Sequence, residues 1–376
     1  MTENKKIGIV GGGQLAMMMT EASRELGISV TVIDPTPGCP ASLVGATQIV
    51  ADYNDLTAIH ELSEKTDVVT IDFEHVNTTA LQQVVETGKS VHPKPQTIAM
   101  IQDKLTQCDF LEFNGLPVAD FKRLDTVEEA HKALTAFDGK MLLKMRHQSY
   151  DGKGNAVVTA DNLEEAWNSF GDAKLYGEAF IPFVKELAVI LARDTEGTIV
   201  IYPTVETIHI NNICHKVFLP GDLNDTVREK AEAIAMKTAE HLEGAGVFAI
   251  EMFLTKDDEI LINEIAPRVH NSGHPTIEGS VTSQFEQHLR AVTGMILGST
   301  DMKHNAAVMI NILGKRNGSA EPKGVGKALE IKGVSVHMYG KHEVKIGRKM
   351  GHLTAVADTL EEASSHAEQA FELIEI

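Results

Sequence analysis

The sequence predicts an α/β domain, then an α+β domain, and finally a small β-rich module. Three observations lead to this fold class. The first ninety or so residues alternate short apolar strands with helical patterns, which is typical of a parallel sheet with crossover helices. From about residue 97 helices and strands mix, and from about residue 300 short strands precede one final helix. A chain of 376 residues can hold two or three domains.

The N-terminal segment, residues 1–96, is predicted to be a Rossmann-like domain. Its strands are expected at residues 7–10, 30–33, 48–51 and 68–71. The first strand runs into Gly11–Ala16, a GxGxxA match that opens a helix, and the second ends in Asp34. Taken alone, this pattern predicts a nicotinamide cofactor. The run His92–Pro95 then marks the domain boundary.

The second segment, residues 97–298, contains residues suited to bind a nucleotide. A helix carries Lys104, and an apolar strand ends in Lys144 before the glycine-bearing loop 146–154. An ammonium and backbone N–H groups can both reach phosphate oxygens, although a structural turn is the alternative. Glu178 and Glu186 flank a stretch whose backbone could meet an adenine edge, or whose apolar side chains could simply be core.

The hairpin within residues 247–274 places two acids opposite each other. If it is centred between Asp257 and Asp258, Glu251 faces Glu264. Their neighbours on that face would be Ala249, Phe253, Ile262 and Ala266. Facing like charges are unfavourable without a cation between them, and Mg²⁺ delivered with nucleotide phosphates would provide one. A solvated surface hairpin is the alternative.

The third segment, residues 299–376, is predicted to be a β-rich module that ends in a helix over 361–373. It holds the densest basic run of the chain, residues 341–349, against a formal net charge of −19. That run is either a solvated face or an anion site for a phosphate monoester. The acidic balance argues against nucleic-acid binding.

Composition further narrows the class of protein to which the chain can belong. No apolar stretch reaches 18 residues, and the N-terminus enters a strand without an export signal, so we expect a cytoplasmic protein with no membrane partner. Cys39, Cys108 and Cys214 are isolated, which predicts neither disulfides nor a zinc site.

Taken together, these parts resemble the ATP-grasp superfamily, and within it the N5-carboxyaminoimidazole ribonucleotide synthetases of purine biosynthesis. Matching strings occur along nearly the whole chain, and the string 263–274 (NEIAPRVHNSGH) is the most specific. The others lie at residues 13–15, 73–76, 150–154, 339–341 and 348–352. The resemblance implies an ATP-grasp fold for residues 97–298, including a mobile lid subdomain at about 121–182.

The resemblance also implies a reaction. Bicarbonate attacks ATP to give carboxyphosphate, and this intermediate, or CO₂ released from it, carboxylates the exocyclic amine of 5-aminoimidazole ribonucleotide. ADP and phosphate are the other products. Such a site needs lysines, Mg²⁺ (or Mn²⁺) and an arginine, and it must exclude water. A homodimer is what the family resemblance implies.

Carried over by motif, the resemblance assigns residues to four roles. Glu251 and Glu264 would bind the metal, and Asp151, Arg268, His270 and Asn271 would be catalytic. The expected nucleotide contacts are Lys104, Lys144, Tyr150, Asp151, Gly152, Lys153, Gly154, Glu178, Ala179, Phe180, Ile181, Glu186, His209, Asn263 and Glu264. The expected ribonucleotide contacts are Gln14, Leu15, Glu74, Tyr150, Lys153, Lys341, Lys345 and Arg348.

The sequence departs from the family pattern at several positions. Ala266 stands where many ATP-grasp enzymes have a third metal ligand, a feature that this family commonly shares. Lys153 and Lys345 stand where arginine is frequent in the family, which loses the bidentate fork. Three rival functions remain open at this point. They are a nicotinamide-dependent oxidoreductase, a nonenzymatic adenine-nucleotide sensor, and the related transformylase that uses formate.

Overall fold

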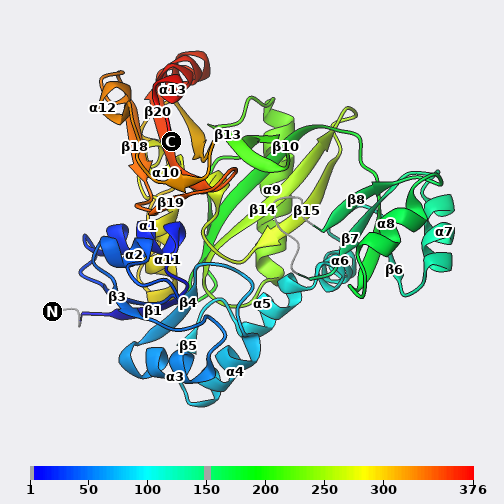
Figure 1. The fold of residues 1–376 in the computed structure, drawn as a ribbon, viewed down its shortest axis with the longest axis horizontal. Coiled ribbons are helices and arrows are strands. Elements are labelled where there is room, and N and C mark those ends of the chain that lie inside the picture. The colour runs from blue at the N-terminus through cyan, green and yellow to red at the C-terminus, as the bar shows by residue number, and fades with distance from the viewer. Residues whose placement is uncertain (1–3, 148–153) are drawn as a thin grey trace.

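A parallel five-stranded sheet forms the N-terminal part of the chain. The structure is a computed structural model that describes residues 4–147 and 154–376 (Figure 1). The strands are β1 (Lys6–Val10), β2 (Ser29–Ile33), β3 (Thr47–Ile49), β4 (Val68–Ile71) and β5 (Ser90–Val91), in the order β3-β2-β1-β4-β5. The helices are α1 (Gln14–Ser23), α2 (Pro40–Leu43), α3 (Leu56–Lys65) and α4 (Thr78–Glu86). The predicted fold of this part is confirmed.

A four-stranded antiparallel sheet projects to the right in Figure 1. Its strands, in the order β6-β9-β7-β8, are β6 (Phe121–Leu124), β9 (Leu175–Ala179), β7 (Met141–Met145) and β8 (Asn155–Val158). Helices α7 (Val127–Ala136) and α8 (Leu163–Ser169) pack on it around a separate small core. Helices α5 (Pro95–Gln102) and α6 (Lys104–Phe113) lead to it from the N-terminal sheet.

The central sheet crosses two of the predicted segments. Its main path, β15-β14-β10-β12-β13-β16-β20-β18, consists of β15 (Ile260–Ala266), β14 (Gly246–Thr255), β10 (Phe183–Arg193), β12 (Val205–Ile210), β13 (Ile213–Leu219), β16 (Ala306–Leu313), β20 (Lys349–Ala357) and β18 (Val334–Met338). Strand β11 (Ile199–Ile201) pairs with β10. Strand β16 pairs antiparallel with β13, so the longer strands of 299–376, β16, β20 and β18, extend this sheet, while two short strands of that segment pair with each other in a separate two-stranded sheet.

Helices and short elements complete the central part. They are α9 (Asp225–His241), a 3₁₀ turn (Asn271–Gly273), α10 (Thr276–Gly279), α11 (Gln284–Thr293), β17 (Gly318–Ser319), α12 (Val325–Ala328), β19 (Glu343–Val344) and α13 (Leu360–Leu373). None of the helices in the described ranges is both long and apolar enough to span a bilayer.

Buried side chains join the N-terminal sheet to the central part. The ring of His288, on α11, lies between the two. Its Nδ1 accepts a hydrogen bond from the Val247 backbone N–H at 3.0 Å, and its Nε2 lies 2.8 Å from Thr70 Oγ1 on β4. One continuous apolar core also contains residues of β1, α1, β14 and α11. The two sheets are therefore held as one packed unit, which positions the cavity between them.

The hairpin of β14 and β15 has the predicted facing glutamates and one unpredicted irregularity. Glu251 pairs with Glu264, as the sequence indicated. A β-bulge then shifts the register, so Met252 pairs with Ile262 and Asn263 is the extra residue. Ile262 was predicted to share the face of the glutamates, and that prediction is wrong, because the bulge turns it into the core on the opposite face, with Met252.

Candidate active site

A cavity of about 760 Å³ lies where the two larger sheets and the four-stranded sheet meet. Most of the sequence-predicted site residues that the structure describes line it. They are Gln14, Leu15, Glu74, Lys104, Lys144, Glu178, Phe180, Ile181, Glu186, His209, Glu251, Asn263, Glu264, Arg268, His270 and Asn271. Segments far apart in the sequence thus converge on one space large enough for a nucleotide and a second small substrate.

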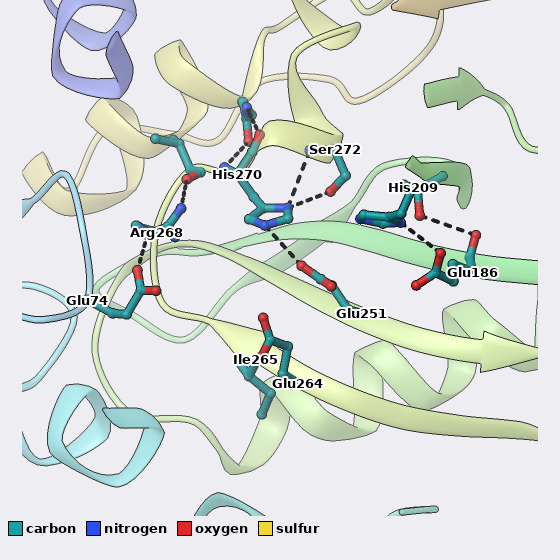
Figure 2. A network of polar contacts seen from close by, with 12 residues as sticks. Glu74, Glu186, His209, Glu251, Glu264, Ile265, Arg268, His270 and Ser272 are labelled. Atoms are coloured by element: carbon teal, nitrogen blue, oxygen red, sulfur yellow. Dashed lines mark hydrogen bonds and ion pairs between the residues drawn. The ribbon is translucent and has the colours of Figure 1, made fainter. Parts of the chain in front are cut away.

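The facing glutamates each contact a different basic residue. Glu264 forms an ion pair with Lys104, the first residue of α6. Glu251 lies with its Oε1 atom 3.0 Å from His270 Nε2 (Figure 2). Burial raises the pKa of Glu251, but the charges of His270 and its other neighbours outweigh burial and hold the pKa at about 2. Each of the two acids therefore has a basic partner that offsets the repulsion that the sequence predicted between them.

The bulge explains why two consecutive residues of β15 both reach the cavity. Successive side chains of a regular strand point to opposite faces. Asn263 and Glu264 nevertheless both line the cavity, because Asn263 is the inserted residue. β-Bulges often re-aim side chains next to active sites.

The segment that follows β15 carries Arg268, His270 and Asn271. The Arg268 guanidinium donates to the Glu74 carboxylate, which comes from the N-terminal part (Figure 2). His270 Nδ1 lies 2.8 Å from Ser272 Oγ, opposite the contact of its Nε2 with Glu251. Asn271 is 8 % exposed, its side chain lies beside the Cys214 thiol, and neither polar atom of its amide makes a well-formed hydrogen bond among residues 4–147 and 154–376. A buried amide in that state is suited to a polar ligand.

The other side of the cavity is lined by residues of β7, β9, β10 and β12. Lys144 Nζ donates to Glu178 Oε1 at 2.7 Å, and both side chains are buried. Farther along, Glu186 Oε2 lies 2.8 Å from His209 Nδ1. Burial lowers the pKa of His209, but the hydrogen bond with Glu186 and its charge outweigh burial and raise it. Two pairs of one basic and one acidic residue thus lie along this wall.

The segment predicted to meet adenine is only partly at the cavity. Phe180 and Ile181 line it, between β9 and β10, whereas Ala179 does not. The Ala179 N–H donates to the Asp120 carbonyl at 2.8 Å and so is already satisfied within the sheet region. The apolar side of the same pocket includes Phe183 and Phe253, whose rings stack with centroids 4.5 Å apart.

The glycine loop after β1 is closed by acids of the protein itself. Asp34 Oδ2 accepts from the Gly12 N–H at 3.2 Å, and Asp72 Oδ2 accepts from the Gly13 N–H at 2.6 Å. A dinucleotide would need such N–H groups for its pyrophosphate. Asp34 is buried and also accepts from the Thr36 N–H, so it is not presented to a ribose. This geometry argues against the nicotinamide alternative.

Some predicted residues lie elsewhere. Gly154, Lys341, Lys345 and Arg348, like Ala179, do not line the cavity. Lys345 is 68 % exposed, and Arg348 donates to the Glu343 carbonyl at 2.9 Å on the surface. Lys341 lies nearer to the cavity than Lys345 and Arg348, since Asp72 of the cavity wall acts on its charge. Burial lowers the pKa of Lys341 to about 8. Tyr150, Asp151, Gly152 and Lys153 lie outside the described residues.

The structure adds residues to the cavity that the sequence reasoning missed. Asp72, Tyr176, His274 and Lys349 also line it. Two of them had a usable signal. Asp72 directly follows β4 as Asp34 follows β2, at the strand ends where ligands of parallel sheets bind. Lys349 closes the basic run that was singled out.

The carboxylates of Glu251 and Glu264 fit Mg²⁺ that is shared with a nucleotide. Within the described ranges there is no group of three or more His, Cys, Asp and Glu side chains arranged to hold a metal. Mg²⁺ does not require one, because it commonly binds through one or two carboxylates together with phosphates and water. Ala266 lies two residues beyond Glu264 and offers no ligand.

Family models match three consecutive parts of the chain. The ribonucleotide synthetase preATP-grasp domain matches residues 4–102, the ATP-grasp domain residues 109–285, and the phosphoribosylaminoimidazole carboxylase C-terminal domain residues 307–366. The N5-carboxyaminoimidazole ribonucleotide synthase of Brucella melitensis is 38% identical over 93% of this chain and 96% of its own length. The chain belongs to the N5-carboxyaminoimidazole ribonucleotide synthase family.

Two further comparisons agree with membership of the N5-carboxyaminoimidazole ribonucleotide synthase family. The phosphoribosylaminoimidazole carboxylase of Ogataea methanolica is 42% identical over 95% of this chain, which spans 67% of that protein. The crystal structure of N5-carboxyaminoimidazole synthase from Aspergillus clavatus in complex with ADP and 5-aminoimidazole ribonucleotide superimposes with a TM-score of 0.91. It is 35% identical, and 99% of each chain is covered.

Family membership confirms the family resemblance seen in the sequence and the predicted fold class. The chain has an ATP-grasp fold that follows a parallel-sheet domain, and it is an ATP-dependent ligase that forms a C–N bond. Its nucleotide is ATP, with Mg²⁺ the metal expected of such enzymes. The nicotinamide alternative, which rested on the glycine loop 11–16 and Asp34, is not supported.

Proposed function

We propose that this chain joins bicarbonate to the exocyclic amine of 5-aminoimidazole ribonucleotide at the expense of ATP. One observation carries the proposal. A single cavity brings together the facing glutamates, two lysines from different elements, and the segment with Arg268, His270 and Asn271. Phosphoryl transfer depends mainly on positioning and charge neutralisation, and those groups supply both.

ATP would bind against β7, β9 and β10. Lys144 and Lys104 are proposed to hold its phosphates. Phe180 and Ile181 are proposed to contact the adenine, and Glu186 with His209 to bind the ribose. Glu251 and Glu264 would hold Mg²⁺, with Asn263 beside them. When bound, Mg²⁺ would neutralise charge on the phosphates. The ion pairs of Lys144 with Glu178 and of Lys104 with Glu264 support the assignment, since they hold both ammonium groups at the cavity.

Bicarbonate is proposed to bind at the segment after β15. The Arg268 guanidinium supplies positive charge, and the Asn271 amide, which makes no well-formed hydrogen bond in the described ranges, offers one donor and one acceptor. An oxygen of bicarbonate attacks the γ-phosphorus as the bond to ADP breaks, which forms carboxyphosphate. Arg268 would stabilise the charge that develops on the transferred group, as an arginine does in other phosphoryl transfers.

The ribonucleotide is proposed to bind between the N-terminal sheet and the basic run. Gln14, Leu15 and Glu74 line that side of the cavity, and Lys341 lies near it. Lys345 and Arg348 are proposed to contact the 5′-phosphate on the basis of the motif. The amine nitrogen bonds to the carboxyl carbon, the bond to phosphate breaks, and the nitrogen loses a proton. The roles of Tyr150, Asp151 as proton acceptor, Gly152, Lys153 and Gly154 rest on sequence alone.

The experiment that tests this function measures ADP release by the purified chain. We expect release to be stimulated by 5-aminoimidazole ribonucleotide and to depend on bicarbonate, with formate unable to replace it. The absence of any stimulation by the ribonucleotide would overturn the proposal, and formate dependence would move it to the transformylase reaction. We further propose that the protein is a cytoplasmic homodimer. Sedimentation of the purified chain would test its oligomeric state.

A further inference from the structure

The side-chain amide of Gln284 forms hydrogen bonds with both the N–H and the carbonyl of the His270 backbone. Gln284 is the first residue of α11 and has no exposed surface. Its Oε1 atom accepts from the His270 N–H at 2.9 Å, and its Nε2 atom donates to the His270 carbonyl at 2.6 Å. One side-chain amide therefore bonds to both backbone groups of a residue that lines the cavity, and the His270 carbonyl also accepts from the Gly273 N–H at 3.0 Å.

The two ends of this contact differ in how they are held. Gln284 sits on a helix that is anchored to both sheets through His288. Its own N–H donates to Thr276 Oγ1 at 2.9 Å. His270, in contrast, lies outside the strands and helices, between β15 and the 3₁₀ turn. The Gln284 amide therefore connects a firmly packed helix to an irregular segment.

Close packing leaves this arrangement little freedom. A Cβ atom at Gly273, in the same segment, would lie 2.3 Å from Gln284 Oε1. The position of the His270 backbone sets where its ring lies, and the ring contacts Ser272 through Nδ1 and Glu251 through Nε2. A displacement of the His270 backbone would therefore move the ring relative to Glu251.

The same helix contains a matched contact away from the cavity. Gln287, also fully buried, donates from Nε2 to the Gly298 carbonyl at 2.8 Å and accepts from the Gly298 N–H at 2.8 Å. Gln287 and Gly298 do not line the cavity. Both glutamines bond to the N–H and the carbonyl of one residue, and Gln284 Nε2 also lies 3.4 Å from His274 Nδ1. Of the two pairs of bonds, the pair of Gln284 ends at a residue of the proposed bicarbonate segment.

We propose that Gln284 is a positioning residue for the carboxylation reaction, one that holds His270, and with it the bicarbonate-binding segment, in place for attack on ATP. The inference rests on the proposed function. Gln284 acts through His270 and touches no substrate itself. Errors of about 1 Å in the placement of reacting groups can cost on the order of a hundredfold in rate, so a loss of this hold should be visible in kinetics.

The experiment compares Gln284→Leu with Gln287→Leu. Each replaces a buried amide by an apolar group of similar size. Gln287→Leu removes the partner of both the Gly298 N–H and its carbonyl, whereas Gln284→Leu leaves the His270 N–H unpaired and its carbonyl still accepting from the Gly273 N–H, so the decrease in Tm should be no larger for Gln284→Leu than for Gln287→Leu. Only Gln284→Leu should raise the KM for bicarbonate and lower kcat, by on the order of tenfold to a hundredfold, while the KM for ATP stays within about twofold. Equal kinetics in the two variants would overturn the inference.

Two further variants keep the test decisive. Gln284→Glu has the same shape, retains an acceptor for the His270 N–H, and places an oxygen against the His270 carbonyl, so it should show the same kinetic loss even if Gln284→Leu does not fold. In a His270→Ala background, Gln284→Glu should add less than about twofold, because residues that act as a unit are not additive. Full additivity would refute action through His270. Wild-type protein without bicarbonate-dependent turnover would instead refute the proposed function.

Discussion

His270 Nε2 lies 3.0 Å from Glu251 Oε1, which joins the proposed bicarbonate segment directly to the proposed metal site. The contact crosses from the segment after β15 to the adjacent strand β14, and it helps to hold the pKa of Glu251 at about 2. Glu251 is therefore ionised across the physiological range, as a metal ligand must be. The proposed metal site and the proposed bicarbonate segment would therefore both depend on this contact.

Glu264→Gln should remove Mg²⁺-dependent turnover and leave the fold intact. The substitution deletes one of two carboxylates at a half-exposed position, so we expect turnover to fall on the order of a hundredfold or more, with little change in Tm. Steady-state ADP release against Mg²⁺ concentration measures this. Glu259→Gln is the control on the same hairpin, because Glu259 is exposed and its side chain pairs with Lys230, away from the cavity. Near-normal turnover of Glu264→Gln would disprove the metal role.

Asn271→Leu should separate activity from stability. The native amide is buried with no well-formed hydrogen bond in the described ranges, so an apolar group of similar size should keep Tm or raise it. The KM for bicarbonate should rise about tenfold or more, because the amide is the proposed ligand. Thermal denaturation and bicarbonate titrations test both parts. A large fall in Tm with unchanged bicarbonate KM would show that Asn271 is structural.

Arg348→Ala should affect the ribonucleotide more than ATP. Loss of one charged hydrogen bond to a phosphate corresponds to about a tenfold increase in KM for the ribonucleotide. Arg348 lies outside the cavity and on the surface, so the fold should tolerate the change. Lys332→Ala, at an exposed position of the same module, is the control. If only the KM for ATP changed, the basic run would not be the phosphate site.

Stability should fall in mild acid because of buried histidines. Burial lowers the pKa of His288 from its ordinary 6.5 to about 3. Above pH 6.5 the ring is neutral in both states, but below it the unfolded chain takes up a proton that the folded chain does not. Stability is therefore lost as the pH falls from about 6.5 towards 3, and His288 alone accounts for roughly 2 kcal/mol at pH 5.

The measurement is Tm between pH 7.5 and 5 for the wild type and for His288→Gln. The variant should be less stable at neutral pH, since the bonds to Thr70 and Val247 are altered, but its Tm should fall less steeply with acid. His241→Gln, at an exposed position, should leave the slope unchanged. Parallel slopes for wild type and His288→Gln would contradict the assignment.

Local patterns in the sequence were enough for several features. Alternating strands and helices indicated the parallel sheet, because each crossover unit is encoded within about 30 residues. The facing of Glu251 and Glu264 followed from strand alternation and the position of a short turn. The motif 263–274 indicated the family through residue identity rather than geometry.

Tertiary structure decided what depends on distant contacts. The bulge at Asn263 moves Ile262 to the other face, and strand periodicity cannot foresee an inserted residue. Arg268 pairs with Glu74 across 194 residues, and the glycine loop that favoured a dinucleotide is closed by Asp34 and Asp72. The sequence by itself therefore determined the elements, the family and most candidate groups. Only packing between elements determined which of those groups share one cavity, because burial and pairing depend on neighbours that are remote in the chain.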